Sequence, residues 1–260
     1  MLRNARLGML LAVFFASASL ASAAEWGDLT GRFLYDGKAP APKPIKVTKD
    51  PEVCSKHKLV EEKLVVGPQG ELANVVVFLR TAKPMVHPDL KDAKGDVVLD
   101  NVNCRFEPHV TLLQTGQALV IKNSDPTGHN TNVTSFNAPF NQSIPIKGEV
   151  KTFFKGEEKV PLEVACNIHP WMKAILVVRS NPYMAASDSE GRFTIAKLPV
   201  GKELEFQLWH ENQGFVKGKG IKGIKGAKVD TRGRFKMKIK PGANDLGEIQ
   251  VDPSVLKPKG

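Results

Sequence analysis

The sequence predicts an all-β protein built from two sandwich-like units, and three observations support this fold class. Short runs rich in Val, Ile, Phe and Thr recur along the chain, and turn-forming residues bound most of them. The chain holds 18 prolines and 22 glycines in 260 residues, which suits many turns. Long stretches with the helical spacing of apolar residues are absent. The length allows two modest domains, each with its own core.

The first 23 residues have the pattern of a cleaved secretory signal. Arg3 and Arg6 precede a short apolar run, and the small residues Ala21-Ser22-Ala23 follow it. The run is too short to cross a bilayer, and no later stretch approaches the ~18 apolar residues that a span needs. We therefore expect an exported protein, periplasmic or extracellular. Removal of both arginines would lower its formal net charge from +10 to +8.

Residues 24–50 predict one strand followed by a linker. The stretch GDLTGRFLYDGKAP is amphipathic and ends near the turn signal Asp36-Gly37. Residues 39–49 are rich in Pro and Lys, a composition typical of an extended, solvated segment. Residues 51–180, which begin with a region containing the apolar strand ANVVVFLR, form the first predicted domain.

Metal-ligating residues gather in the segment PLEVACNIHPWMKAILVV, residues 161–178. This segment predicts a strand, a short loop and a second strand, and the loop carries Cys166, His169 and Met172. A thiolate, two imidazoles and a weak axial thioether form the ligand set of a blue-copper site. His129 is the candidate for the second imidazole, because it follows a turn-rich stretch and begins another strand. Zn²⁺ would accept the same residues.

The pattern N-x-D-x-x-x-H-N over residues 123–130, followed by C-x2-H-P-W-M from residue 166, resembles the cupredoxins. The likeness is greatest to the plastocyanin and amicyanin branch and covers roughly residues 99–179. It implies a cupredoxin-like Greek-key β-sandwich for residues 51–180. It also implies one type 1 copper ion, with His129, Cys166, His169 and Met172 as the ligands.

The same resemblance carries two further expectations for the surroundings of the site. Asn130 would brace the ligand loops, usually against a Ser or Thr that follows the Cys, whereas Asn167 occupies that position here. An exposed edge of His169 would let a redox partner approach through the imidazole. The apolar residues that could ring this edge are Phe140, Pro170 and Trp171, with a buried place in the core as the alternative for Trp171.

The three cysteines suit this assignment. Three thiols in an exported protein cannot all pair, and with Cys166 bound to a metal, Cys54 and Cys104 remain as a disulfide. The alternative is a second metal site, in which His57 and His109 complete a Cys2His2 set with these two cysteines. An oxidising compartment favours the disulfide.

Residues 181–252 contain D-x-x-G-R-F-x-I-x-x-L-P-x-G and then the alternating strand ELEFQLWHE. This pattern is similar to the carboxypeptidase-regulatory-like, or transthyretin-like, β-sandwich modules. In those modules a strand such as GDLTGRFLYDGKAP often begins the sheet, which implies that residues 24–50 pair with this second sandwich. Residues 216–240 form a basic insert that we expect to be a mobile hairpin or loop, and residues 253–260 form a tail. We expect His210 to be structural.

The whole arrangement resembles bacterial periplasmic cupredoxin-like proteins that are often labelled methylamine-utilisation proteins. The resemblance implies a one-electron carrier whose partner is a periplasmic cytochrome or dehydrogenase. It implies no enzyme, because four protein ligands leave the metal no open position. The alternative is an exported copper-carrying or structural interaction module. The basic charge suits an acidic redox partner or an anionic membrane surface, and no nucleic-acid-binding motif is present.

Overall fold

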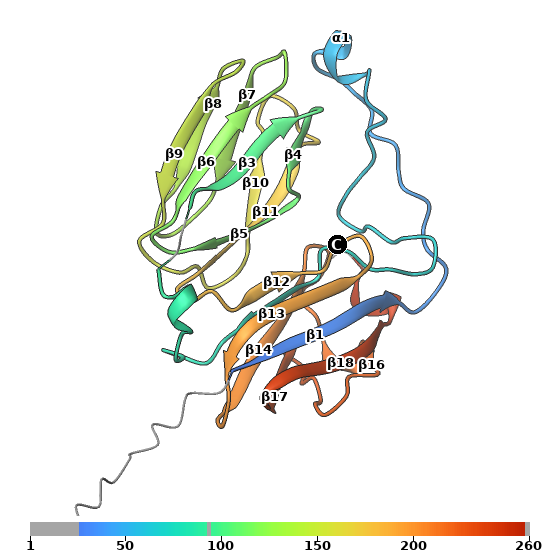
Figure 1. The fold of residues 1–260 in the computed structure, drawn as a ribbon. Coiled ribbons are helices and arrows are strands. Elements are labelled where there is room, and N and C mark those ends of the chain that lie inside the picture. The colour runs from blue at the N-terminus through green and yellow to red at the C-terminus, as the bar shows by residue number, and fades with distance from the viewer. Residues whose placement is uncertain (1–25, 93–94, 258–260) are drawn as a thin grey trace, which may run out of the picture.

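Nearly all regular structure in this chain is β-strand, which confirms the predicted fold class. The computed structural model describes residues 26–92 and 95–257, and Figure 1 shows two sandwiches stacked one above the other. The helical segments of the described ranges are short: α1 (Pro51–Cys54), η1 (Pro88–Leu90), η2 (Gly218–Gly220) and η3 (Pro253–Val255). None of these is long and apolar enough to cross a membrane. The predicted signal, residues 1–23, lies outside the described residues.

The upper sandwich packs two sheets against each other. One sheet has the order β4 (Arg105–Glu107), β3 (Val97–Val102), β6 (Ala118–Asn123) and β9 (Glu149–Phe153). The other has the order β5 (Val110–Gln114), β11 (Lys173–Arg179), β10 (Leu162–Ala165), β7 (His129–Val133) and β8 (Phe140–Ile144). Alternating burial along β10, with Leu162 and Val164 inside and Glu163 outside, shows why such a sequence forms one layer of a sandwich.

The lower sandwich combines both ends of the chain. Its first sheet has the order β13 (Arg192–Pro199), β1 (Trp26–Tyr35), β18 (Gly242–Val251) and β16 (Ile221–Lys222). Its second sheet has the order β12 (Met184–Ala186), β2 (Val76–Leu79), β14 (Glu203–His210) and β15 (Gly214–Phe215), with β17 (Arg234–Lys238) also paired to β14. Strand β1 pairs with β13 and β18, so the N-terminal strand does lie in a sheet of the C-terminal unit.

Strand β2 lies in a different sheet from the one that the sequence suggested. It falls within residues 51–180, yet it pairs with β12 and β14 of the lower sandwich. All four of its residues are buried, so the strand needs cover on both faces. In the lower sandwich β2 lies between two other strands, and both of its faces are covered. An apolar run in the sequence does not indicate which sheet the strand will join.

Two parts of the basic insert, residues 216–240, pair into the sheets, where a mobile hairpin or loop was expected. Strand β16 pairs with β18, and β17 pairs with β14. Val216, Val229 and Phe235 are buried in the lower core, between lysines that point to solvent. These spaced apolar residues anchor the insert in the lower core despite its high local charge, which the sequence prediction did not foresee.

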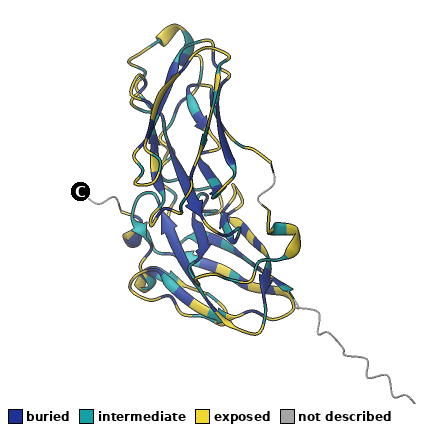
Figure 2. Cartoon of the chain, turned by 90° about the vertical axis from the view of Figure 1, so that its left-hand side faces the viewer, coloured by how far each residue is buried: buried dark blue, intermediate teal, exposed yellow. Residues whose placement is uncertain are grey.

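The two sandwiches meet through a buried apolar layer. Its members come from β2, β14, β5 and β11 and are Val76, Phe78, Val110, Ile175, Val177 and Trp209. Arg179 lies over the Phe78 ring at 4.7 Å and donates to the carbonyl oxygen of Leu79 at 3.4 Å. Figure 2 shows buried residues continuing along the strands from one sandwich into the other. The layer fixes the upper sandwich, and its site, on the lower one.

Candidate metal centre

The loop between β10 and β11 is closed by its own backbone. The N–H of Cys166 donates to the Met172 carbonyl at 3.2 Å, and the N–H of Met172 donates to the His169 carbonyl at 2.9 Å. The His169 N–H also donates to the Cys166 sulfur at 3.4 Å. This turn holds the three predicted ligands of the segment in one tight loop, as the spacing C-x2-H-x2-M suggested.

Strand β7 brings the fourth predicted ligand to this loop. His129 is the first residue of β7, which pairs with β10 through Val133 and Asn132. The Nδ1 atoms of His129 and His169 lie 2.9 Å apart, and the Cys166 sulfur lies 3.8 Å from the His169 Nδ1. One ligand atom from each of these three residues falls within 4.8 Å of the others, and all three side chains are buried. Met172 is also buried, in the core beside them.

The outer nitrogen of each histidine is held by a carboxylate. His129 Nε2 donates to Asp125 at 2.8 Å, and His169 Nε2 donates to Asp50 at 2.8 Å. Asp125 is itself fixed by the backbone N–H groups of Asn103, at 2.6 Å, and Cys104, at 2.8 Å. Since a carboxylate only accepts hydrogen bonds, both rings carry a proton on Nε2, so Nδ1 is the nitrogen that each ring turns toward the sulfur and toward the other ring. Carboxylates in this position orient metal-binding histidines and raise their basicity.

The thiol of Cys166 lies in surroundings that favour the thiolate. Burial raises its pKa, but hydrogen bonds involving His129 and His169, together with backbone N–H groups, outweigh burial and lower the pKa to about 5. The thiolate is the form that binds metals. Two imidazole nitrogens and one thiolate at this spacing therefore suit a soft or borderline metal such as copper or zinc.

Asn130 braces the ligand loop, but through the backbone of its partner. Its side-chain oxygen accepts the N–H of Asn167 at 2.5 Å, and its amide donates to Asn141 at 2.8 Å. The side chain of Asn167 points instead toward Asn132, at 3.4 Å. Replacement of the usual Ser or Thr by Asn167 therefore leaves the brace intact, because every non-proline residue carries the N–H that makes it.

Residues 43–62, which we call the cap, cover His169. The cap closes on itself where the Ile45 N–H donates to Leu59 and the Glu61 N–H donates to Lys43. It contains α1, and Figure 1 places α1 at the end of the upper sandwich farthest from the lower one. His169 is 0% exposed, whereas the Asp50 carboxylate that covers it is 36% exposed.

The expected exposed edge of His169 is therefore absent. The Pro/Lys-rich stretch 39–49 was expected as a solvated linker, but it folds back because Ile45 and Val47 pack on the upper core. The Asp50 carboxylate also accepts a hydrogen bond from Thr127 at 2.9 Å, which fixes the cap to the loop before β7. His169 is thus enclosed on the side where a redox partner was expected.

A disulfide joins Cys54 to Cys104, 50 residues apart, and Cys166 is the free cysteine. This confirms the predicted pairing and rules out the alternative second metal site with His57 and His109, because paired sulfurs are not thiolate ligands. His109 instead donates from Nε2 to the Glu211 carboxylate at 2.8 Å. The disulfide ties the cap to the loop after β3.

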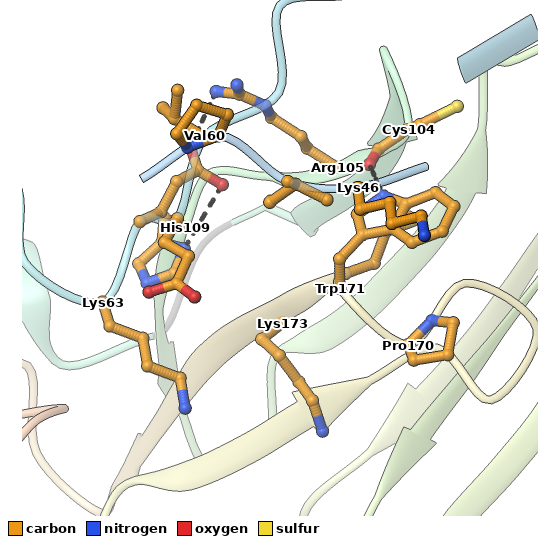
Figure 3. A pocket seen from close by; sticks show the side chains of 14 residues that line it. Lys46, Val60, Lys63, Cys104, Arg105, His109, Pro170, Trp171 and Lys173 are labelled. Carbon is orange, nitrogen blue, oxygen red and sulfur yellow. Dashed lines mark hydrogen bonds and ion pairs between the residues drawn. The ribbon is translucent and has the colours of Figure 1, made fainter. Parts of the chain in front are cut away.

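A pocket of about 320 Å³ opens between the cap, β4 and the ligand loop (Figure 3). Trp171 lies in its wall, donates from Nε1 to the Cys104 carbonyl at 3.2 Å, and has its ring centroid 5.2 Å from that of His169. The exposed residues Lys46, Lys63 and Pro170 also line the pocket, so it opens to solvent. Trp171 is partly buried, so it lies between the two predicted alternatives, an exposed edge beside His169 and a buried place in the core.

Sequence reasoning missed Asp50 as a site residue. Asp50 lies 119 residues from His169, in a stretch without ligand-like spacing. The one available signal was the nearby Cys54, because its expected pairing with Cys104 brings this part of the chain close to the ligand loops. Asp125 belonged to the recognised pattern, but its contact with the outer nitrogen of His129 was not foreseen.

Comparison with solved structures finds partial similarity to copper proteins. A copper-containing nitrite reductase from Thermus scotoductus SA-01 aligns at 21% identity with a TM-score of 0.31, over 37% of this chain and 25% of its own. A reduced Cu(I) form of an amicyanin mutant aligns at 18% identity with a TM-score of 0.30, over 40% of this chain and 98% of its own. An oxidised amicyanin mutant aligns at 16% identity with a TM-score of 0.30, over 40% of this chain and 98% of its own.

This chain thus spans a quarter of the length of that nitrite reductase. No protein-family model matches the chain. No curated protein matches it by sequence.

Proposed function

We propose that this chain is an exported electron-transfer protein that holds one type 1 copper ion between His129, Cys166, His169 and Met172. The observation that carries the proposal is the convergence of two Nδ1 atoms and the Cys166 sulfur within 4.8 Å, in a buried site. Two imidazoles and a thiolate, with a weak thioether from Met172, are the donors that copper accepts in such sites. Zinc would fit the first three donors, so the identity of the metal is what the experiment must decide.

When bound, copper would supply a one-electron couple between Cu(I) and Cu(II). The residues around it would limit how far the ligands move when the charge changes. Asp125 and Asp50 fix the two rings, Asn130 fixes the loop backbone, and the cap excludes water from His169. A site with little reorganisation suits repeated electron transfer.

The enclosed site favours an electron carrier over the alternative, a copper-carrying or structural module. Handover of a metal requires an entering ligand to reach it, and burial of His129, Cys166 and His169 opposes that approach. The same burial, with four protein donors, argues against an enzyme acting at this centre, because no coordination position is left for a substrate. The expected partner is a periplasmic cytochrome or dehydrogenase.

The visible absorption and EPR spectra of the protein titrated with Cu(II) test this function. We expect an intense sulfur-to-copper band and narrow hyperfine splitting, both lost in Cys166→Ala. The control is His57→Ala, which removes a histidine outside the site and should leave the spectra unchanged. A colourless copper complex, or a band that survives Cys166→Ala, would contradict the proposal. Rapid surrender of Cu(I) to a small chelator would favour the carrier alternative.

A further inference from the structure

The direct route from solvent to the metal through His169 is closed. Its Nε2 is occupied by Asp50, and the ring is 0% exposed. His129 is equally inaccessible, at 1% exposure, with its outer nitrogen on the buried Asp125. Because electron tunnelling falls steeply with distance, an electron carrier with both imidazoles enclosed needs another short path to its surface.

Trp171 offers that path. It is the neighbour of Met172 in the chain, and its ring centroid lies 5.2 Å from that of His169. Its indole is held in place by the hydrogen bond to the Cys104 carbonyl, and Cys104 is fixed by the disulfide to the cap. In Figure 3 the ring lies in the wall of the pocket that opens between the cap and the ligand loop. One rigid aromatic ring thus joins the ligand loop to a cavity in contact with solvent.

The charge around this pocket is mainly positive. Four cationic side chains line it, namely Lys46, Lys63, Arg105 and Lys173, against the carboxylates of Glu61 and Glu62. Arg105 pairs with Glu62 at 2.9 Å, and Lys173 pairs with Glu163 at 2.6 Å. Within the described part of the chain, Lys46 and Lys63 are exposed and form no ion pair with an acidic side chain. They therefore remain open to an approaching anion.

We infer that the port for electrons is the Trp171 pocket rather than His169, and that it receives a redox protein presenting a carboxylate-rich surface. The inference rests on the proposed function and names the docking face for it. Lys46 and Lys63 attract the acidic surface, and the apolar walls formed by Trp171 and Pro170 exclude water at the contact. One electron crosses Trp171 in either direction: when the partner is oxidised the metal is reduced by one electron, and the reverse holds when the partner is the oxidant. No bond is made or broken, and no proton is transferred.

The docking face can be tested in the metal-free protein by NMR. Hexacyanocobaltate(III), a redox-inert trianion, should shift the Trp171 indole N–H signal and the backbone signals of Lys46 and Lys63. The cation hexaamminecobalt(III) should leave them in place. Lys46→Glu combined with Lys63→Glu should abolish the shifts. The control pair Lys217→Glu and Lys219→Glu makes the same change of charge in the basic insert and should preserve them.

Stopped-flow oxidation of the copper-loaded, reduced protein by hexacyanoferrate(III) tests the electron path. We expect the Lys46/Lys63 double variant to react about tenfold more slowly than the control pair at low ionic strength, with the difference vanishing at high salt. Trp171→Leu should be slow at every salt concentration. Trp171→Phe, which keeps an aromatic ring, should recover most of the rate. The absorption and EPR spectra of each variant are the control, and they should match those of the wild-type copper site.

Equal NMR shifts with the anion and the cation, or shifts that the Lys46/Lys63 variant retains, would overturn the docking face whether or not copper binds. Equal oxidation rates for Trp171→Leu and the wild-type protein, with unchanged spectra, would contradict the proposal that electrons pass through Trp171. Failure of the proposed function is a separate outcome, seen as a wild-type protein that forms no blue complex. The metal-free titration still decides the docking face in that case.

Discussion

At the scale of single residues, each histidine of the centre is oriented by one carboxylate, and the two carboxylates differ in how firmly they are held. Asp125 is buried and receives two backbone N–H groups besides His129. Asp50 is partly exposed, receives Thr127, and belongs to a cap whose attachment depends on distant contacts. The hydrogen bond from Thr127, followed by the contact with His169, outweighs partial burial and holds the pKa of Asp50 below its usual range.

We expect Asp50→Asn to weaken copper binding by about 10- to 100-fold, because the neutral amide orients the His169 ring less firmly and lowers its basicity. Competition with a chelator of known affinity measures the loss. Asp36→Asn is the control, since Asp36 pairs with Lys222 at 3.0 Å in the lower sandwich. Equal affinities for the two variants would show that the cap carboxylate does not support the ligand.

We expect the buried His210 to make the stability depend on pH. Full burial disfavours its charged form and lowers its pKa from 6.5 to about 4, with the nearby His109 adding to the effect and Glu211 opposing it. The unfolded chain therefore binds more protons than the folded one between these values. The folded state should lose stability as pH falls from about 6.5 to about 4, by up to ~3 kcal/mol. Chemical unfolding near both pH values should show a smaller decline in His210→Gln than in the wild type.

Some residues of the site could be predicted because they lie close together in the sequence, and others could not because they are brought in by long-range contacts. Cys166, His169 and Met172 lie within one loop, so their spacing was sufficient to predict that they meet, and the structure brings His129 to them. Asp50 and the cap could not be predicted in the same way. Their place depends on Ile45 and Val47 finding the upper core, a long-range contact that a Pro/Lys-rich sequence conceals.

At the scale of elements, we expect the Cys54–Cys104 disulfide to keep the cap closed over His169. Loss of the Cys54–Cys104 disulfide in a double Ala variant should lower the free energy of unfolding of the metal-free protein by about 3–4 kcal/mol, from the entropy of a loop of this length. Because α1 and Asp50 would then open more often, copper should also pass to a chelator faster. Denaturant titration and the decay of the blue band measure the two effects. An unchanged rate of copper loss would mean that packing alone keeps the cap closed.

Among the strands, β17 shows how much of the basic insert belongs to the fold. Phe235 is 1% exposed and stacks on Phe206 with centroids 5.1 Å apart. Phe235→Ala should cost about 3–5 kcal/mol of stability, whereas the exposed neighbour in Lys236→Ala should cost little. Denaturant titration of both variants provides the comparison. If both variants lost equally little stability, the insert would contribute little to the fold, as expected for a mobile loop.

The strand segments themselves were largely predictable, because β6, β10 and β11 follow clear apolar patterns and turn residues precede β7. The pairing of β2 was not. A run buried on both faces indicates a central strand, but its neighbours β12 and β14 lie more than a hundred residues away in sequence. Local pattern carries no information about such pairings.

At the scale of the whole molecule, the buried layer between the sandwiches should make them unfold together. Phe78→Ala removes a ring that belongs to this layer and lies under Arg179, and it should cost about 3–5 kcal/mol. We expect two signals to be lost at the same lower temperature: the blue absorbance of the proposed copper site, which would report the upper sandwich, and the far-ultraviolet circular dichroism. Two separate transitions would show that the layer does not couple the units.

The position of Cys104 also has a consequence for biogenesis. Its sulfur lies within 4.8 Å of ligand atoms of Asp125 and His129. Before it pairs with Cys54, Cys104 therefore offers a second thiol near His129, one that competes with Cys166 for an arriving copper ion. Oxidative folding that joins Cys54 to Cys104 first leaves Cys166 as the free thiol. We expect disulfide formation to precede metal loading, so that copper enters a chain whose cap is already tethered.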